Sequence, residues 1–172
     1  MTDLKQKILA AVKDDLVAIE QALADNLEPC FDLVEKVAGH LLFAGGKRLR
    51  PLLMVLCARL CGRADLDIIR YSTIFEYLHA ATLLHDDIVD GADMRRGRQV
   101  AHRIWDPSTV VLAGDFLLAR GLSVAADTGS SDVIRTIAQI TENMSQGEIR
   151  QLEKKGDLTL TEAQYHEVIR CK

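Results

Sequence analysis

The sequence predicts an all-α protein that folds as a single helical domain over residues 1–172. Apolar residues recur at steps of three and four along most of the chain, which is the period of an amphipathic helix. A composition of 48% apolar and 27% charged residues with only three prolines is typical of a folded globular chain. The periodic segments, each expected to form one helix, are residues 2–23, 29–42, 51–61, 66–90, 107–126, 132–152 and 159–172.

The first three helices are expected from their ends or from their apolar pattern. Thr2 is a common capping residue, and the apolar stripe that follows it runs to Leu23. Pro29 begins the second helix, which the glycines at positions 45 and 46 terminate. Residues 51–61 are apolar on nearly every side of the helix, so this segment is expected in the core with other helices around it.

The later helices carry start and stop signals. Gly91 follows residues 66–90 at the position where a left-handed residue commonly ends a helix. Pro107 introduces the next helix, in which two adjacent valines would allow a short strand but the length and the alanines favour helix. Thr159 and Glu162 have the spacing of a capping box and begin the last helix.

The overall composition excludes several classes of protein. There are 21 Lys and Arg against 25 Asp and Glu, and this net charge of -4 argues against a general nucleic-acid binder. No uncharged apolar stretch reaches the roughly 18–20 residues that span a bilayer, so no transmembrane segment is expected. The four cysteines form no CxxC pair and the amino-terminal region lacks a secretory apolar run, so a cytoplasmic location is expected.

Three carboxylates lie in the last turn of the fourth predicted helix, where the negative end of the helix dipole disfavours them. They are Asp86, Asp87 and Asp90. At about 100° per residue, Asp86 and Asp90 share a stripe with His79, while Asp87 lies to the side. Hard divalent cations take one or two carboxylates and leave positions for water and phosphate oxygens. The cluster therefore predicts a Mg2+ site, and the alternative is a solvated acidic helix end.

Cations gather at the opposite kind of helix end. Lys47, Arg48 and Arg50 crowd the start of the third predicted helix, where the positive dipole end repels them and an anion would relieve the repulsion. Arg95 and Arg96 follow the acidic cluster closely. We expect one diphosphate on the metal and a second, metal-free diphosphate on Lys47, Arg50 and Arg96, which suits an enzyme with two substrates. The alternative is a solvated basic loop.

The chain resembles the trans-isoprenyl diphosphate synthases in three segments that occur in the same order: GGKRLRP, EYLHAATLLHDDIVDGADMRRG and AGDFLLARG. HDDIVD is similar to the first aspartate-rich motif of that family, DDxxD, which paired arginines follow. The family consists of all-helical enzymes that elongate allylic diphosphates with isopentenyl diphosphate. The resemblance implies an antiparallel helical bundle of the isoprenoid synthase type, a Mg2+-dependent prenyltransferase and a homodimer.

The resemblance also implies a role for each matching position. Asp86 and Asp90 would bind Mg2+ with support from Asp87, and Arg95 would complete the catalytic set. Arg95 and Lys172 would hold the allylic diphosphate. The residues implied for isopentenyl diphosphate are Lys47, Arg50, His79 and Arg96.

Two further expectations concern the product and the extent of the chain. Ala81 and Thr82 are small where bulky aromatic residues would close the product pocket early, so a long polyprenyl chain of the quinone side-chain kind is expected, although Leu78 could block the channel. Any membrane contact would be peripheral, through the product. No second DDxxD occurs in the sequence, and Lys172 aligns with a lysine in mid-family. We therefore expect the amino-terminal part of a larger synthase domain, incomplete at the carboxyl end and inactive alone.

Two other functions stay open. One is a non-catalytic partner subunit of a heteromeric prenyl synthase. The other is a helical metal-dependent phosphohydrolase, because His85 and Asp86 form the adjacent His-Asp pair that such enzymes use.

Overall fold

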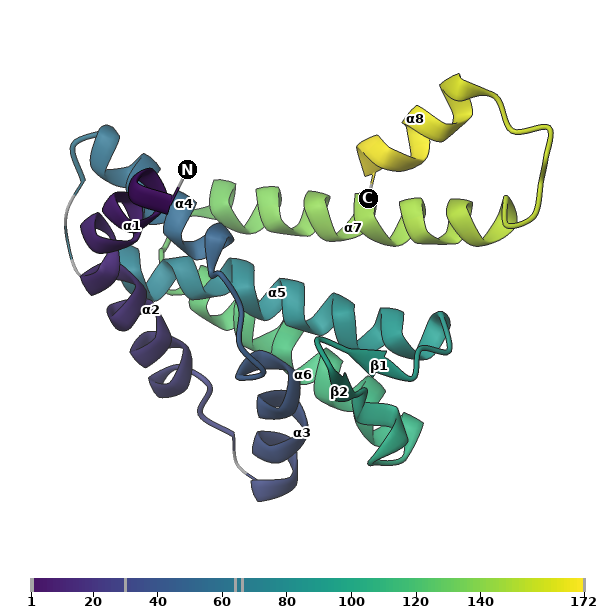
Figure 1. Ribbon diagram of the computed structural model, residues 1–172, viewed down its shortest axis with the longest axis horizontal. Coiled ribbons are helices and arrows are strands. Elements are labelled where there is room, and N and C mark those ends of the chain that lie inside the picture. The colour runs from purple at the N-terminus through teal and green to yellow at the C-terminus, as the bar shows by residue number, and fades with distance from the viewer. Residues whose placement is uncertain (1, 30, 64, 66, 172) are drawn as a thin grey trace. The chain divides into compact units, whose positions relative to one another are not determined.

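The computed structural model describes residues 2–29, 31–63, 65 and 67–171, and Lys172 lies outside these residues. Most of the described chain is helical, which confirms the predicted all-α fold (Figure 1). The chain forms two compact units, residues 1–128 and 129–172, which we describe separately. A single domain over residues 1–172 stays a prediction.

The first unit is a bundle of helices with one small hairpin. In chain order its elements are α1 (Thr2–Ala11), α2 (Lys13–Asp25), α3 (Asp32–Leu42), α4 (Leu49–Leu60), α5 (Asp67–Val89), β1 (Met94–Arg95), β2 (Arg98–Gln99), the short 3-10 helix η1 (Ala101–Arg103) and α6 (Pro107–Ala126). The second unit consists of α7 (Ser131–Glu153) and α8 (Glu162–Cys171), and α8 packs on α7. The predicted helix over residues 107–126 is confirmed at both ends, and Gly91 has the expected left-handed φ of 62° just after α5.

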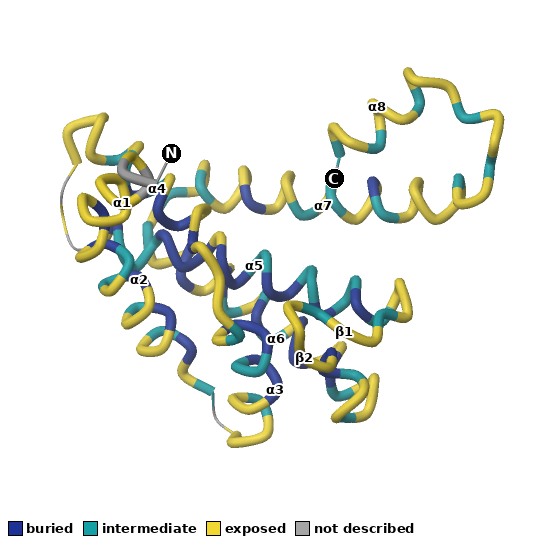
Figure 2. The backbone as a smooth tube through the Cα atoms, viewed as in Figure 1, coloured by how far each residue is buried: buried dark blue, intermediate teal, exposed yellow. Residues whose placement is uncertain are grey.

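The core of the first unit lies where α5 packs along α6 and α2, while α3 packs against α5 and α6, and α4 packs against α5 and α2. Ile19 of α2, Tyr77 and Leu84 of α5, and Leu117 of α6 are each no more than 1% exposed. Burying one such side chain contributes roughly 1.5–3 kcal/mol. The Tyr77 hydroxyl donates to the Leu23 carbonyl oxygen at 2.8 Å, so its polar end is satisfied inside the core. Figure 2 shows buried positions, in dark blue, along α5 in the middle of the first unit.

The expectation that residues 51–61 form a core helix is wrong. Leu53 is 59% exposed and Leu60 is 88% exposed, and the Cys57 thiol is exposed as well. Within the described part of the chain, α4 packs against α5 and α2 and leaves these side chains exposed. An apolar composition on every side shows what a helix could bury, but it does not show how many neighbours the helix has.

The single helix expected over residues 2–23 is divided in two. Val12 has φ -112° and ψ 9°, outside the α-helical region, and it separates α1 from α2. No glycine or proline marks this break, and the apolar period continues across it. Pattern alone therefore could not find it.

A hairpin that the sequence analysis did not predict follows α5. Strand β1 pairs antiparallel with β2, with Met94 opposite Gln99 and Arg95 opposite Arg98. The two residues between the strands, Arg96 and Gly97, have φ of 53° and 77°. Positive φ at both central residues is the requirement of a type I′ turn, which joins twisted strands closely. The hairpin returns Arg95 to the end of α5 and places Arg96 against the loop before α4.

The capping box of the last helix lies two residues later than expected. Thr161 and Gln164 form it: the Thr161 N–H donates to the Gln164 side-chain oxygen at 2.9 Å, and the Gln164 N–H donates to the Thr161 hydroxyl at 3.3 Å. Thr159 instead donates to Asp157 in the preceding turn. Thr with Glu and Thr with Gln both satisfy the spacing of a capping box, so the sequence predicted the motif but not its position.

Helix α6 is long and apolar enough to cross a bilayer by length and composition alone. Asp115 and Arg120 interrupt its apolar sequence. In the bundle 39% of the apolar window is buried, and the core helices of globular proteins pass the same test. This is weak evidence for a membrane span.

Candidate functional site

The acidic cluster lies at the carboxyl end of α5, and the helix places its members on different faces. Asp86 is half-buried and Asp90 is exposed, whereas Asp87 is only 2% exposed. His79 and Thr82 are half-buried on the same open stripe as Asp86, in agreement with the helical spacing. The stripe and the buried Asp87 therefore have different environments.

Asp87 is held by Arg95 from the hairpin. Both Nε and Nη2 of Arg95 lie 2.7 Å from Oδ1 of Asp87. The hydrogen bond from Arg95 to Asp87 raises the pKa of the guanidinium, and the charges of Asp87, Asp86 and Asp90 raise it further against the opposing effect of burial. Arg95 is thus fixed beside all three carboxylates while 31% of its side chain stays exposed.

The basic loop before α4 does not present all of its cations outward. Lys47 and Arg50 are exposed, but Arg48 is only 4% exposed, and its guanidinium binds the buried Glu76 and the part-exposed Glu20. The expectation that three cations crowd this helix start for lack of an anion is therefore wrong for Arg48. The protein itself supplies the anions for this residue.

The exposed cations line a hollow of about 340 Å³ together with His79 and Arg96. Its lining residues are Gly46, Lys47, Arg48, Leu49, Arg50, Glu76, His79 and Arg96. Arg96 also donates from Nη1 to the Gly45 carbonyl oxygen, which ties the hairpin to the basic loop. The structure thus brings together Lys47, Arg50, His79 and Arg96, which are far apart in the sequence.

His79 has an electrostatic environment that suits an anion. Burial lowers the pKa of its imidazole, and the positive charges of Arg50, Arg96 and Arg95 lower it further, while Glu76 acts in the opposite direction. The ring is therefore neutral near pH 7. It lies near several positively charged guanidinium groups and carries no negative charge that would compensate them. An anion in the hollow would relieve that imbalance.

The carboxylates at the end of α5 suit a hard divalent cation whose remaining ligands come from water and from a substrate. Among the described residues, no group of three or more His, Cys, Asp or Glu side chains could hold a metal ion. Arg95 binds the buried Asp87, whereas Asp86 is half-buried and Asp90 is exposed, so Asp86 and Asp90 are the carboxylates that we consider as metal ligands. Mg2+ is usually held by one or two carboxylates together with water and substrate phosphates, so the residues present fit it.

His85, next to the cluster, is engaged in helix packing. Its Nε2 lies 3.1 Å from the Val111 carbonyl oxygen and 3.5 Å from Oδ1 of Asp115, both on α6. The ring lies against Gly114, where a Cβ atom would collide with it. The glycine therefore allows α6 to approach the last turn of α5.

Two residues of this region were missed as functional candidates. Glu76 is buried, lies one helical turn before His79 and lines the hollow, and Glu20 reaches the same arginine from α2. A glutamate on an otherwise apolar helix face was the available signal for Glu76, because a buried carboxylate needs a partner. Lys172, the remaining predicted site residue, lies outside the described residues.

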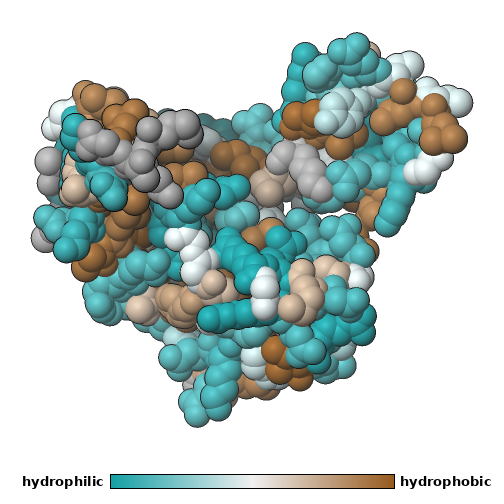
Figure 3. All heavy atoms as spheres, in the orientation of Figure 1, coloured by the Kyte–Doolittle hydropathy of each residue, from teal (hydrophilic) through white to brown (hydrophobic). Residues whose placement is uncertain are grey.

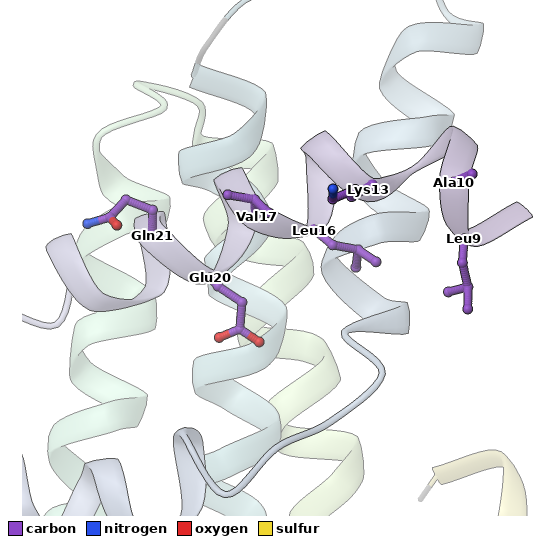
Figure 4. A pocket seen from close by; sticks show the side chains of 7 residues that line it. All are labelled: Leu9, Ala10, Lys13, Leu16, Val17, Glu20 and Gln21. Carbon is purple, nitrogen blue, oxygen red and sulfur yellow. The ribbon is translucent and has the colours of Figure 1, made fainter. Parts of the chain in front are cut away.

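A larger hollow, of about 690 Å³, lies on the α1–α2 segment, and its lining includes Lys13 and Glu20 among mainly apolar residues. Figure 4 shows its lining, in which Leu9, Leu16 and Glu20 project to the same side of the segment. Figure 3 shows apolar atoms gathered on this end of the first unit. Its mainly apolar lining distinguishes it from the cationic hollow.

Comparison with known proteins identifies the family. The model of the polyprenyl synthetase family matches residues 31–172. The chain belongs to the polyprenyl synthetase family. It is 37% identical over 171 residues to the all-trans-nonaprenyl-diphosphate synthase (geranyl-diphosphate specific) of Rhodobacter capsulatus, a match that covers 99% of this chain and 53% of that protein. It is 32% identical over 167 residues to the octaprenyl diphosphate synthase of Escherichia coli K12, which covers 97% of this chain and 52% of that protein.

Solved structures show the same fold. The polyprenyl synthase of Caulobacter crescentus CB15, complexed with calcium and isoprenyl diphosphate, has a TM-score of 0.90 at 36% identity and covers 97% of this chain and 51% of that one. A decaprenyl diphosphate synthase of Rhodobacter capsulatus also has a TM-score of 0.90, with 97% and 52% covered. The predicted isoprenoid synthase fold is therefore confirmed. This polyprenyl synthetase family member spans about half the length of the relatives it matches.

Proposed function

We propose that this chain carries the amino-terminal half of a Mg2+-dependent trans-prenyltransferase that condenses an allylic diphosphate with isopentenyl diphosphate. The observation that carries the proposal is the separation of two anion sites along α5. Lys47, Arg50, His79 and Arg96 line a hollow without carboxylates other than the paired Glu76. Asp86 and Asp90 lie farther along the same open stripe.

The two sites suit two diphosphates of different kinds. The hollow offers positive charge and N–H donors directly, so it would hold isopentenyl diphosphate without a metal. The carboxylates repel an anion unless a cation lies between them, so Asp86 and Asp90 would hold the allylic diphosphate through Mg2+. Arg95, fixed beside Asp87, would donate to the same allylic diphosphate.

The reaction follows from bringing the two esters together. When bound, Mg2+ supplies positive charge that neutralises the departing diphosphate. The allylic C–O bond breaks, the double bond of isopentenyl diphosphate attacks the resulting allylic cation, and a C–C bond forms. A proton is then lost to the released diphosphate, which gives a product one C5 unit longer. The cationic hollow fixes the attacking alkene, and exclusion of water prevents capture of the cation.

We propose a long polyprenyl product. The proposal rests on the small side chain of Thr82, which is half-buried on the open stripe of α5, whereas Ala81 is only 3% exposed. The relatives named above make nonaprenyl and octaprenyl diphosphates, according to their names. A cytoplasmic homodimer that contacts the membrane only through its product is part of the same proposal.

The binding of each substrate can be tested by titration calorimetry on this chain. In EDTA, isopentenyl diphosphate should bind the wild type, and Lys47→Ala should weaken binding about tenfold, since one charged hydrogen bond is lost. With Mg2+ present, a non-reactive allylic diphosphate analogue should bind in a way that requires Asp86 and Asp90. The matched control is Arg63→Ala, which removes an exposed arginine that pairs with Asp65 outside the hollow. Unchanged affinity of Asp86→Ala for the analogue would remove the metal assignment.

Turnover distinguishes the proposal from its alternatives. The chain should condense the two substrates only when the remaining half of a family member is supplied, and condensation by the chain alone would contradict that requirement. A non-catalytic subunit would leave the rate of such a complex unchanged when Asp86 is replaced. A phosphohydrolase would release phosphate from isopentenyl diphosphate alone.

A further inference from the structure

Arg48 lies in the loop that carries the cations of the hollow, yet its own guanidinium is directed into the protein. It donates from Nε to Glu20 at 2.7 Å, from Nη1 to Glu76 at 2.8 Å, and from Nη2 to the Leu42 carbonyl oxygen at 2.7 Å. A second bond from Nη2 reaches Glu20 at 3.1 Å. These acceptors belong to α2, α5 and the end of α3. One side chain therefore ties the basic loop to three helices.

The backbone at Arg48 takes an uncommon conformation to achieve this. Its φ is 47°, in the left-handed region that residues other than glycine seldom adopt. It occupies the N-cap position of α4 and makes no side-chain cap there. Because Arg48 turns inward, its neighbours Lys47 and Arg50 are left on the surface, where they line the hollow. The ion pairs hold the loop in the conformation that exposes those two cations.

The same contacts determine the charge that a ligand would meet. Glu76 lines the hollow, and its side chain is only 7% exposed. A bare carboxylate at that position would repel a diphosphate, and little water is available to screen it. Arg48 lies 2.8 Å away and balances the charge. Burial opposes the charged form, but the hydrogen bonds to Glu20 and Glu76 and the charges of these two carboxylates together outweigh it and raise the pKa of Arg48, so it stays charged.

We propose that Arg48 is a positioning residue of the isopentenyl diphosphate site, which fixes the basic loop and neutralises Glu76 without touching the substrate. Although Arg48 is among the residues that line the hollow, its side chain is only 3% exposed and donates four hydrogen bonds to protein acceptors, so it has little capacity left for a ligand. This role rests on the proposed function, because it requires that the hollow binds a diphosphate.

Calorimetry in EDTA with inorganic pyrophosphate and with isopentenyl diphosphate tests the role. Arg48→Met should weaken both ligands about tenfold, because Glu76 becomes a bare anion beside them. The double variant Arg48→Met with Glu76→Gln should recover most of that loss. Arg63→Met, at an exposed arginine, should change nothing. If the wild type binds neither ligand, the proposed function itself fails, whereas wild-type affinity in Arg48→Met overturns only the role of Arg48.

The pKa of the His79 imidazole is a second measurement, which should not change if Arg48 has only a structural role. This pKa, measured by NMR without ligand, should rise in Arg48→Met because Glu76 loses its partner, and it should fall back in the double variant. If Arg48→Met does not fold, Arg48→Lys replaces it in the experiment. Because the positive charge remains, the pKa of His79 should stay constant. The affinity for both ligands should fall about threefold, because lysine cannot reach all three acceptors. An unmoved pKa in the folded Arg48→Met variant, or affinity that Glu76→Gln does not restore, would overturn the proposal.

Discussion

Replacing Gly114 with alanine should destabilise the first unit, because a methyl group has no space between α5 and α6. A Cβ atom at this position would lie 2.7 Å from Cδ2 of His85 and closer still to Nε2. Both distances are far inside ordinary contact, so the His85 ring must move. It would then lose its approach to the Val111 carbonyl oxygen at 3.1 Å.

The expected size of the effect is the difference between two opposing contributions. Overpacking of this kind costs about 1–3 kcal/mol of unfolding free energy. A glycine-to-alanine change within a helix returns about 0.4–1 kcal/mol, because it reduces the freedom of the unfolded chain. The net loss is about 1–2 kcal/mol, and at about 2–4 °C per kcal/mol for a chain of this size the Tm should fall by about 2–8 °C.

Gly121 provides a matched control on the same helix. It is also buried, but a Cβ atom there would lie 3.6 Å from Cδ2 and Cγ of Leu78, which is ordinary contact. Gly121→Ala should therefore gain about 0.4–1 kcal/mol. The same glycine-to-alanine change should therefore lower the unfolding free energy at position 114 and raise it at position 121.

Urea unfolding followed by circular dichroism measures both variants. Adding His85→Ala to Gly114→Ala removes the atoms that collide, so the two changes should couple and the double variant should be more stable than their sum predicts. Equal stability of Gly114→Ala and Gly121→Ala would refute the steric explanation. So would additive effects of His85→Ala and Gly114→Ala.

Three further predictions follow from single features of the structure. Asp87→Asn should cost about 2 kcal/mol of unfolding free energy, because it weakens the charged hydrogen bonds that the part-exposed Arg95 donates to this buried carboxylate. Asp90→Asn at an exposed position should stay within about 0.5 kcal/mol, and similar urea midpoints for the two variants would contradict this. An anion in the hollow should raise the lowered pKa of His79. The affinity for pyrophosphate should therefore increase as the pH falls from about 8 to about 6. Calorimetry of His79→Gln should show a weaker dependence of this affinity on pH. Thr161→Ala should cost about 1 kcal/mol at the start of α8, which hydrogen exchange should detect as faster exchange in that helix and not in the first unit.

The sequence predicted what depends on local interactions. The helices at residues 66–90 and 107–126 follow from apolar periodicity together with Gly91 and Pro107, which act within a turn of their own positions. The stripe that His79 shares with Asp86 follows from the same period. Family membership was also accessible, because its motifs are short and contiguous.

Other features depended on which segments meet, and the sequence left them open. The exposure of α4 depends on how many helices surround it, and the break at Val12 has no residue signal. Asp87 differs from its neighbours because Arg95 returns to it through a type I′ hairpin. None of these can be derived from the period of one helix.

The clearest contrast lies within the basic loop. The sequence by itself determined that cations gather before α4 and that carboxylates gather at the end of α5, since both are clusters along the chain. Only the tertiary structure decided that Arg48 turns inward while Lys47 and Arg50 face the hollow. The physical reason is that the acceptors of Arg48, Glu20 and Glu76, each lie 28 residues away in sequence, and folding alone brings them within hydrogen-bond distance of one guanidinium.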